Sequence, residues 1–251
     1  IKYEMKKSLI LVVIACIIAG CSGDIKQQKF IGMSGNPKSV KETVYEATEE
    51  FGEIVEGDIE KSCYYEFDKE GFVVKTISIH CYDGDTIFIA TDKLKKGYLE
   101  ESYYVSKSDS ILTAYTFKNR DSKTKIMEAK SLDGGFTTSV IETEGRKEVV
   151  TDKNSEGKTT GKYERYFDNK GNIIEYKVLG KDEVDYWTKL TFDNKSRLTK
   201  KEVIVCSENM SGEVGTYTYK YEEADSKGNW TKSVEYFNDK PSHITTREIL
   251  Y

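Results

Sequence analysis

Turn signals recur along almost the whole chain at a nearly regular spacing, and this spacing constrains the fold more than any other feature. Clusters of Asp, Asn, Gly, Ser and Lys follow one another roughly every 11 to 17 residues. Such spacing accommodates strands of about 8 to 10 residues joined by short hairpin loops, with no room for helices or crossovers. The clusters lie near residues 56–58, 68–71, 83–85, 92–97, 106–109, 119–123, 133–135, 144–145, 154–157, 168–171, 180–183, 193–196, 207–212, 225–228 and 238–241. The spacing predicts an all-β fold, a long antiparallel meander of hairpin repeats that forms a curled or elongated sheet.

The residue types agree with this prediction. After residue 20, Val, Ile and Thr total 53 residues, whereas Ala and Leu total 13. β-Branched residues pack well on a pleated surface, whereas Ala and Leu favour helices. Some fourteen or more strands must curl, close or split, because open twisted sheets rarely exceed about ten strands. Charges on both faces of the strands argue against closure into a membrane-spanning barrel, in which a lipid-facing Arg costs about 2–4 kcal/mol at mid-depth.

One segment has a weaker β pattern than the rest. Val40, Val44, Ala47 and Phe51 recur at helix-like spacing, with a Ser before them that could cap a helix. Gly52 and the neighbouring Thr and Tyr residues weaken a helix. Of the two alternatives for residues 40–55, helix or strand, we favour strand.

The N-terminal region reads as a targeting signal. Met5-Lys6-Lys7 begins a basic segment, and an apolar run from Leu9 to Ala19 ends on Gly20-Cys21. A run of about 11 apolar residues is too short to span a bilayer and has the length typical of a secretory signal. The ending resembles a bacterial lipobox, in which the cysteine is acylated. We therefore expect a signal peptide over 1–20, lipidation at Cys21, a flexible tether over 21–37 and a β-repeat domain over 38–251.

Charge and histidine content exclude several function classes. The chain has 38 Lys and Arg, 43 Asp and Glu and two His, for a net charge of −5. Without residues 1–20 the counts are 35 and 42, for a net charge of −7. A negative chain offers no global attraction to nucleic acid or anionic lipid. With two histidines, the usual His-based catalysis and zinc binding have few ligands to use.

Several of the turns share one chemistry. An Asp opens the turn and a Gly stands three residues later, which matches the preferences of a type I turn. The residues of these repeat turns are Asp68 and Gly71, Asp168 and Gly171, and Asp225 and Gly228. The sequence from Asp193 to Ser196 keeps the Asp and lacks the Gly.

These turns sit in a longer degenerate repeat. An aromatic residue, Asp, two polar residues, Gly and often Asn recur in 65–71, 165–176, 190–200 and 217–251. The pattern resembles the YD repeat of RHS-like β-repeat lipoproteins from Bacteroidetes-type bacteria. The resemblance implies an extracytoplasmic antiparallel sheet that is repeated along its length, with no catalytic residues to carry over.

The cysteines leave alternatives open. Cys63, Cys81 and Cys206 remain besides the lipidated cysteine. In an oxidising compartment Cys63 and Cys81 could form a disulfide. The alternative, which we favour, is that these cysteines are buried unpaired thiols.

A search for chemistry gives mostly negative results. His80 and Cys81 are adjacent, and on a strand they point to opposite faces, so they cannot share an ion without a bulge. Residues 152–157 imitate the start of an EF-hand loop, but position twelve of that loop would be Tyr163 instead of the closing Glu. We find no nucleophile motif and no phosphate-binding loop. We expect neither metal nor cofactor.

The aromatic residues have two readings. Tyr pairs across strands stabilise sheets, and exposed rows of aromatics could stack on sugar rings or a partner protein. The candidate binding aromatics are Tyr217, Tyr219, Tyr221 and Trp230.

We therefore expect a non-enzymatic lipoprotein of the cell envelope, anchored in the outer membrane. It would present a sheet surface to a protein or a glycan. The alternatives are a carboxylate-based glycan hydrolase and an assembly component that pairs with a partner through its sheet edges.

Overall fold

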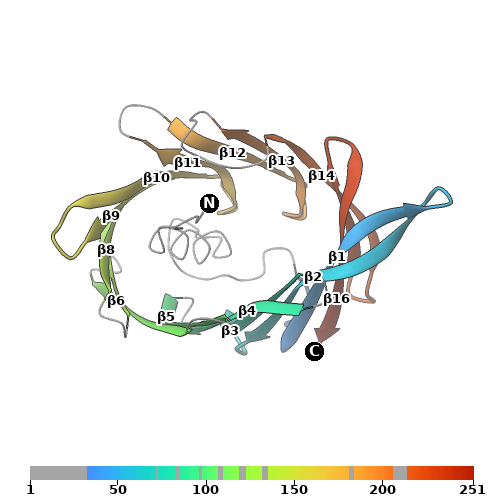
Figure 1. The fold of residues 1–251 in the computed structure, drawn as a ribbon, viewed down its shortest axis with the longest axis horizontal. Helices are drawn as coiled ribbons and strands as arrows, with labels where there is room; N and C mark the ends of the chain where they lie inside the picture. The colour runs from blue at the N-terminus through green and yellow to red at the C-terminus, as the bar shows by residue number, and fades with distance from the viewer. Residues whose placement is uncertain are drawn as a thin grey trace, which may run out of the picture.

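The computed structural model describes residues 33–71, 73–82, 85–95, 98–106, 110–118, 123–131, 135–180, 184–205 and 214–251. These residues form sixteen strands in chain order (Figure 1). The strands are β1 (Ser39–Glu50), β2 (Glu53–Phe67), β3 (Val73–Tyr82), β4 (Asp85–Lys95), β5 (Tyr98–Ser106), β6 (Ser110–Lys118), β7 (Thr124–Ser131), β8 (Phe136–Glu144), β9 (Lys147–Asn154), β10 (Thr159–Phe167), β11 (Ile173–Leu179), β12 (Val184–Phe192), β13 (Leu198–Val205), β14 (Gly215–Ala224), β15 (Trp230–Phe237) and β16 (Lys240–Leu250). Among the described residues, no helix is long and apolar enough to cross a membrane.

The strands form a single antiparallel meander, which confirms the predicted fold class. Each strand pairs with its neighbours in the sequence, and the sheet curls until it closes into a ring (Figure 1). Closure pairs β1 with β16, from Ser39 opposite Leu250 to Glu46 opposite His243. An open sheet of this size would leave two long edge strands unpaired, and closure removes both edges.

The segment of uncertain helix or strand character is β structure, as favoured, but its turn lies elsewhere than predicted. β1 and β2 join through Phe51 and Gly52, whose φ angles are 54° and 84°. Positive φ at both central residues is the signature of a tight type I′ hairpin. The turn predicted at 56–58 is wrong, because Gly57 lies within β2. The true turn escaped prediction because Phe is rarely found in a left-handed conformation.

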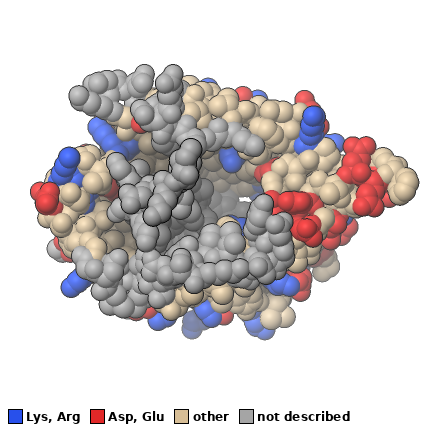
Figure 2. Space-filling view, viewed as in Figure 1, with Lys and Arg blue, Asp and Glu red and all other residues tan. Residues whose placement is uncertain are grey.

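The two faces of the sheet differ in burial and composition. In β9 the residues Glu148, Val150 and Asp152 are buried, whereas Val149 and Thr151 between them are partly exposed. The more buried set faces the inside of the ring, since alternate residues of a strand point to opposite faces. Figure 2 shows Lys, Arg, Asp and Glu side chains around the outer circumference.

The inner face carries two small apolar clusters among its polar residues. One joins Ile141, Val150 and Tyr163 across β8, β9 and β10. The other joins Val40, Cys63, Tyr65 and Val73, with Met33 packed against it. A further buried pair, Val234 and Ile244, is 1% and 0% exposed and lies on the other face of β15 and β16 from Ser233 and Thr245.

The chain enters the ring at the rim where it also ends. The Lys38 amide donates to the Leu250 carbonyl at 2.7 Å, and the Phe67 amide donates to the Lys38 carbonyl at 3.0 Å. Residues 33–37, which the sequence assigned to the end of the tether, contact this rim through Met33 and Ser34. The predicted signal peptide and Cys21 lie outside the described residues.

The cysteines of the described chain are unpaired. Cys63 is buried on the inner face, 3.5 Å from the Ser78 hydroxyl, and Cys81 is half-buried. The two do not form a disulfide, so the favoured reading of free thiols holds for this pair. Cys206 lies outside the described residues.

Candidate functional site

The repeat turns adopt the predicted geometry. In the turn that opens at Asp68, the Glu70 amide donates to the carboxylate at 2.9 Å, and Gly71 has a φ of 85°. Asp168 accepts from the Lys170 amide at 2.8 Å, and Asp225 accepts from the Lys227 amide at 2.9 Å. The glycines of those two turns, Gly171 and Gly228, have φ angles of 87° and 80°. Each Asp therefore holds its turn through a side-chain bond two residues on.

These turns all lie at one rim of the ring. Each follows an even-numbered strand, and in a meander such turns share the rim at which β1 begins and β16 ends. We call this rim, defined by the turns at 68–71, 168–171, 193–196 and 225–228, the turn rim. The turn from Asp193 to Ser196 keeps the geometry without Gly, with Ser196 at a φ of 59°.

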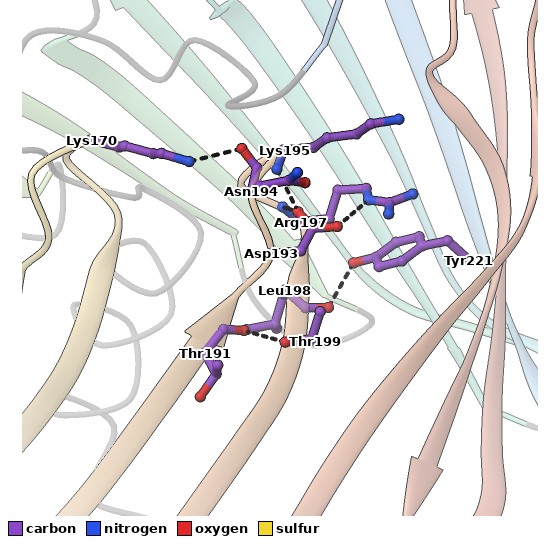
Figure 3. Close-up of polar contacts among 9 residues, drawn as sticks. All are labelled: Lys170, Thr191, Asp193, Asn194, Lys195, Arg197, Leu198, Thr199 and Tyr221. Carbon is purple, nitrogen blue, oxygen red and sulfur yellow. Dashed lines mark hydrogen bonds and ion pairs between the residues drawn. The ribbon is translucent and has the colours of Figure 1, made fainter.

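Neighbouring turns on the turn rim are bonded to one another (Figure 3). Figure 3 draws the Lys170 ammonium donating to the Asn194 carbonyl at 2.8 Å. In addition, the Asn172 amide group lies 3.3 Å from the Ser196 hydroxyl. Asn172 also donates to Asp168 at 2.7 Å. The Asn at the fifth repeat position thus connects its own turn to the next turn.

At the last repeat the N-terminal segment and the C-terminal residue take the place of a following turn. The Ser34 amide donates to the Asn229 side chain at 2.6 Å, and the Asn229 amide group donates back to the Ser34 carbonyl at 2.9 Å. Tyr251 accepts from Asn229 at 2.6 Å and donates to Asp225. The row of turns therefore ends on residues from both ends of the chain.

Three of the candidate binding aromatics form a row on the inner face of β14. Tyr217, Tyr219 and Tyr221 alternate along the strand and therefore share one face. Tyr221 lies opposite the buried Ser233, and Tyr217 lies opposite Lys201, which shares a face of β13 with the buried Val203, so the row is on the inside of the ring. We call these three residues the tyrosine ladder. The sequence grouped them correctly, but the stripe faces inward.

The middle of the tyrosine ladder meets a histidine held between two carboxylates. Tyr219 bonds to Glu235, whose carboxylate lies 2.8 Å from His243 Nδ1. Glu60 lies 2.9 Å from Nε2 of the same ring. The hydrogen bond to Glu235 is the largest cause that raises the pKa of His243. Burial is the largest influence on Glu235 and acts to raise its pKa, but the bonds from His243 and Tyr219 outweigh it and hold that pKa below its usual range.

At the turn rim the tyrosine ladder ends in an aromatic pair between two arginines. The rings of Tyr221 and Trp230 lie 5.2 Å apart. The Arg247 guanidinium lies 3.4 Å from the Trp230 ring centre, and Arg197 lies 4.7 Å from the Tyr221 ring centre. Burial raises the pKa of Tyr221 to about 12. Its hydroxyl donates to the Leu198 carbonyl at 2.8 Å (Figure 3).

Arg247 also connects this pair to the seam of the ring. Its Nε and a terminal nitrogen both lie 2.6 Å from a Glu42 carboxylate oxygen. Tyr65 donates to the other oxygen of Glu42 at 3.4 Å. The opposite end of the tyrosine ladder carries Tyr217, 4.8 Å from Phe237, with the Lys201 ammonium 4.5 Å from its ring.

A second group of charges lies on the inner face of β7 to β10. Glu148 is fully buried, 4.0 Å from the Lys125 ammonium and 3.8 Å from Arg165 Nε. Asp152 accepts from the Ser139 hydroxyl at 2.6 Å, and burial raises its pKa. Asp152 is thus a hydrogen-bonded residue of the inner lining of the ring. The described residues contain no group of three or more acids, histidines and cysteines that could hold a metal ion.

The other metal-capable residues are His80 and Cys81, adjacent on β3. His80 pairs with Lys61 across the sheet and shares a face of β3 with Ser78. The pairing of β3 with β4 shifts register between His80 and Cys81. Burial, together with Lys61, lowers the pKa of His80 to about 4.

Sequence reasoning missed the charged partners of the tyrosine ladder. Glu42, Glu60, Glu235, His243 and Arg247 come from four strands at the two ends of the sequence. For four of them the signal is that each occupies the same parity as an inward residue of its own strand, whereas Glu60 lies at the register shift between Lys61 and Ile59 and does not follow the alternation. That signal becomes readable only when β1 is known to pair with β16.

Comparisons with known proteins identify no family for this chain. No protein-family model matches the sequence, and no curated protein matches it. Among solved structures, the chain is similar to a porin-like protein from Bacteroides uniformis, with 11% identity, a TM-score of 0.46, and coverage of 85% of this chain and 96% of that chain. It is also similar to a DUF1329 family protein from Desulfovibrio piger, with 11% identity, a TM-score of 0.24, and coverage of 94% and 92%. At these values neither likeness carries an argument about function.

Proposed function

We propose that this protein is a lipid-anchored lipoprotein of the bacterial cell envelope whose ring binds a glycan on its inner wall, without catalysing a reaction. The single observation that carries the proposal is the tyrosine ladder. It combines aromatic rings with a carboxylate–histidine group and an arginine–carboxylate pair on one continuous inner surface.

The chemistry of this surface suits a sugar chain. Sugar rings present C–H faces that stack on aromatic rings, and their hydroxyls bond to carboxylates, imidazoles and guanidinium groups. Tyr217, Tyr219 and Tyr221 recur every second residue along β14, so they are spaced by about 7 Å. Glu235 and Arg247 stand beside them on the next two strands. Binding sites of this kind pair apolar rings with a few fixed polar groups.

The outer wall supports anchoring by lipid rather than embedding in a bilayer. It carries exposed ion pairs on three widely separated parts of the ring, Lys41 with Glu248, Lys93 with Glu101, and Lys200 with Glu202. A lipid-facing wall requires a continuous apolar band, and each midplane Lys or Arg would cost about 2–4 kcal/mol. The proposed acyl chains on Cys21 would instead hold a water-exposed ring at the membrane surface, since two chains give stable attachment.

The protonation of the carboxyl groups supports glycan binding over glycan hydrolysis. A glycan hydrolase needs one carboxylic acid that is still protonated, paired with a second carboxylate within about 10 Å. The lowered pKa of Glu235 keeps that group ionised. Asp152 has a raised pKa, but Glu148 lies four residues away on the same strand, at a spacing of about 13 Å.

Closure of the ring weighs against the alternative of partner pairing through the terminal sheet edges. β1 and β16 are the strands that would form those edges, and they pair with each other over Ser39–Glu46. A strand from a partner therefore has no terminal edge of the ring to extend.

The proposal is tested by titrating the full chain with soluble oligosaccharides from bacterial envelopes, peptidoglycan fragments and capsular fragments, in a calorimeter. We expect saturable binding that weakens at least tenfold in Tyr219→Ala. Tyr64→Ala removes a tyrosine from the outer face of β2 and serves as the matched control. Equal affinities of the two variants for every glycan that binds, or no binding of any of these glycans, would overturn the proposal.

A further inference from the structure

The hairpin between β1 and β2 extends well beyond the ring. β1 pairs with β16 only as far as Glu46, and β2 pairs with β3 only from Lys61 onward. Residues 46–60 therefore form a ribbon in which, beyond Glu46 and before Lys61, the two strands pair only with each other among the described residues, and it meets the wall through Glu56 with Lys232 and Glu60 with His243. Figure 1 shows this ribbon projecting outward from the ring. Register shifts at Val44 and Tyr45 mark the point where it leaves the wall.

The tip of the ribbon presents an aromatic side chain to solvent. Phe51 is 106% exposed, and its backbone is held in the left-handed region with a φ of 54°. Asn or Asp is the usual residue at this place in a tight hairpin, because those residues tolerate positive φ and interact well with water. Ile59, near the base, is 42% exposed. Phe51 thus combines full exposure with a backbone conformation that is rare for Phe, a combination that the turn itself does not require.

The ribbon also contains all of the excess negative charge of the chain after residue 20. Residues 46–60 have seven acids and no Lys or Arg, namely Glu46, Glu49, Glu50, Glu53, Glu56, Asp58 and Glu60. Without them, residues 21–251 contain 35 acidic and 35 basic side chains. Figure 2 shows the acidic side chains gathered on the projecting ribbon, next to an uncharged tip.

Few of these acids are neutralised within the molecule. Glu56 lies 4.0 Å from the Lys232 ammonium, and Glu60 lies 2.9 Å from His243. In the described part of the chain, Glu49, Glu50 and Glu53 near the tip form no ion pair with a basic side chain. The charge around Phe51 therefore faces solvent without compensation.

We propose that the ribbon of residues 46–60 is a docking arm for a protein surface that carries Lys and Arg around a small apolar pocket for Phe51. Charge complementarity selects this partner over the others. Anionic lipid and nucleic acid would be repelled, and a second copy of this chain offers a balanced ring instead of a basic one. Opposite charges would speed the encounter, and burial of the phenyl ring would supply the affinity.

The position of the arm fits this role. The arm leaves the ring at the rim opposite the turn rim. Residues 33–38 enter the ring at the turn rim. The arm therefore lies at the rim remote from the one at which the described chain begins. Docking itself does not depend on the anchor or on glycan binding, so the two proposals fail independently.

The test begins with photocrosslinking in intact cells from Phe51→p-benzoylphenylalanine. The matched control is the same replacement at Phe136, which is 38% exposed on the outer face of β8. We expect one protein to crosslink from position 51 and not from position 136. That protein is then purified and its affinity for the full chain is measured between 50 and 300 mM salt.

Two variants separate docking from folding. Phe51→Asn keeps a residue that suits the turn, so its melting temperature should equal or exceed that of the wild type while affinity falls at least tenfold. The triple variant Glu49→Gln, Glu50→Gln, Glu53→Gln should also weaken binding at least tenfold and flatten its salt dependence. The matched triple Glu142→Gln, Glu144→Gln, Glu156→Gln, in exposed positions far from the arm, should bind as the wild type does.

Three results would overturn the proposal. They are no selective crosslink from position 51, a crosslink to a second copy of this chain, and a crosslinked protein that binds Phe51→Asn or the Glu49, Glu50, Glu53 triple with wild-type affinity. Glycan binding by Phe51→Asn should equal that of the wild type. A loss of glycan binding only in Tyr219→Ala therefore reports on the proposed function alone.

Discussion

At the scale of single residues, His243 links stability to pH. Its pKa is raised, chiefly by the hydrogen bond to Glu235 and also by Glu60. A raised pKa in the folded state means that the stabilisation is fully present below the unfolded value of about 6.5 and is lost as pH rises through the folded value. We predict that the free energy of unfolding, measured in urea from pH 6 to pH 9, falls more in the wild type than in His243→Gln.

His80 provides the internal control for this prediction. Its pKa is lowered to about 4 by burial and by Lys61, so its ring is neutral in the folded protein across the whole range, whereas the unfolded ring takes up protons at about pH 6. A lowered histidine pKa gives a contribution of the opposite sign, which is gained as pH rises through the unfolded value of about 6.5. His80→Gln should therefore lose more stability than the wild type from pH 6 to pH 9. Parallel curves for the wild type and His243→Gln would show that Glu235 and Glu60 do not hold a charged histidine.

Gly171 tests the backbone of the repeat turn. Its φ is 87°, and a Cβ added there would meet no atom within 4 Å, so Ala at this position introduces backbone strain alone. We predict that Gly171→Ala lowers the free energy of unfolding by about 1 kcal/mol, because a left-handed residue with a Cβ costs about that much. Gly171→Asn should cost less. A neutral Gly171→Ala, measured by urea unfolding, would contradict the left-handed turn.

At the scale of elements, the repeat turns act as a connected row. The turns that open at Asp168 and Asp193 are joined by Lys170 with Asn194 and by Asn172 with Ser196. We predict that Asp168→Ala costs about 2 kcal/mol, since two backbone amides lose a charged acceptor. Combined with Asp193→Ala, the cost should depart from additivity by at least about 0.5 kcal/mol.

The distant repeat supplies the control for this cycle. Asp68 opens the turn between β2 and β3, remote from Asp168 in the ring. Asp168→Ala with Asp68→Ala should therefore be additive within about 0.5 kcal/mol. Additivity in both pairs would mean that the lateral bonds between turns contribute nothing to stability.

The turns also differ in whether their positions could be predicted from the sequence. The repeat turns were predictable because Asp and Gly each have a local reason to be there, and residues 168–171 fold as those reasons require. The hairpin at Phe51 was not predictable, because its residue types contradict the local preference and Gly57 offered a false alternative. The residue preference of a tight hairpin turn is therefore violated at Phe51, the residue to which we assign docking.

At the scale of the whole molecule, the seam between β1 and β16 decides whether the ring closes. Arg247 and Glu42 form its inner pair, with side chains 9% and 16% exposed, whereas the outer pair of Lys41 and Glu248 is 49% and 72% exposed. We predict that Arg247→Met costs about 3 kcal/mol because it leaves a largely buried carboxylate unpaired. Lys41→Met should cost no more than about 0.5 kcal/mol. Equal costs in urea unfolding would contradict the assignment of inner and outer faces.

Neither the closure of the ring nor the surface around the tyrosine ladder could be predicted from the sequence, and the reason is the same for both. Charges occupy both faces of the strands, Lys41 and Glu248 outside and Glu148 and Arg165 inside, so alternation alone does not reveal which face is inner. The prediction of a curled sheet is confirmed, but the pairing of Glu42 with Arg247 joins residues 205 positions apart. Only the register of the first and last strands brings them to the tyrosine ladder.

Binding on the inner wall can be tested directly because the chain contains only two tryptophans, on opposite faces. Trp230 contacts the tyrosine ladder, whereas Trp187 lies on the outer face between Lys177 and Lys189. The measurement is the fluorescence of Trp187→Phe and of Trp230→Phe during titration with an envelope oligosaccharide. Inner-wall binding predicts a saturable change in Trp187→Phe that is absent in Trp230→Phe. A change that persists in Trp230→Phe and disappears in Trp187→Phe would place the ligand on the outer wall and contradict the account.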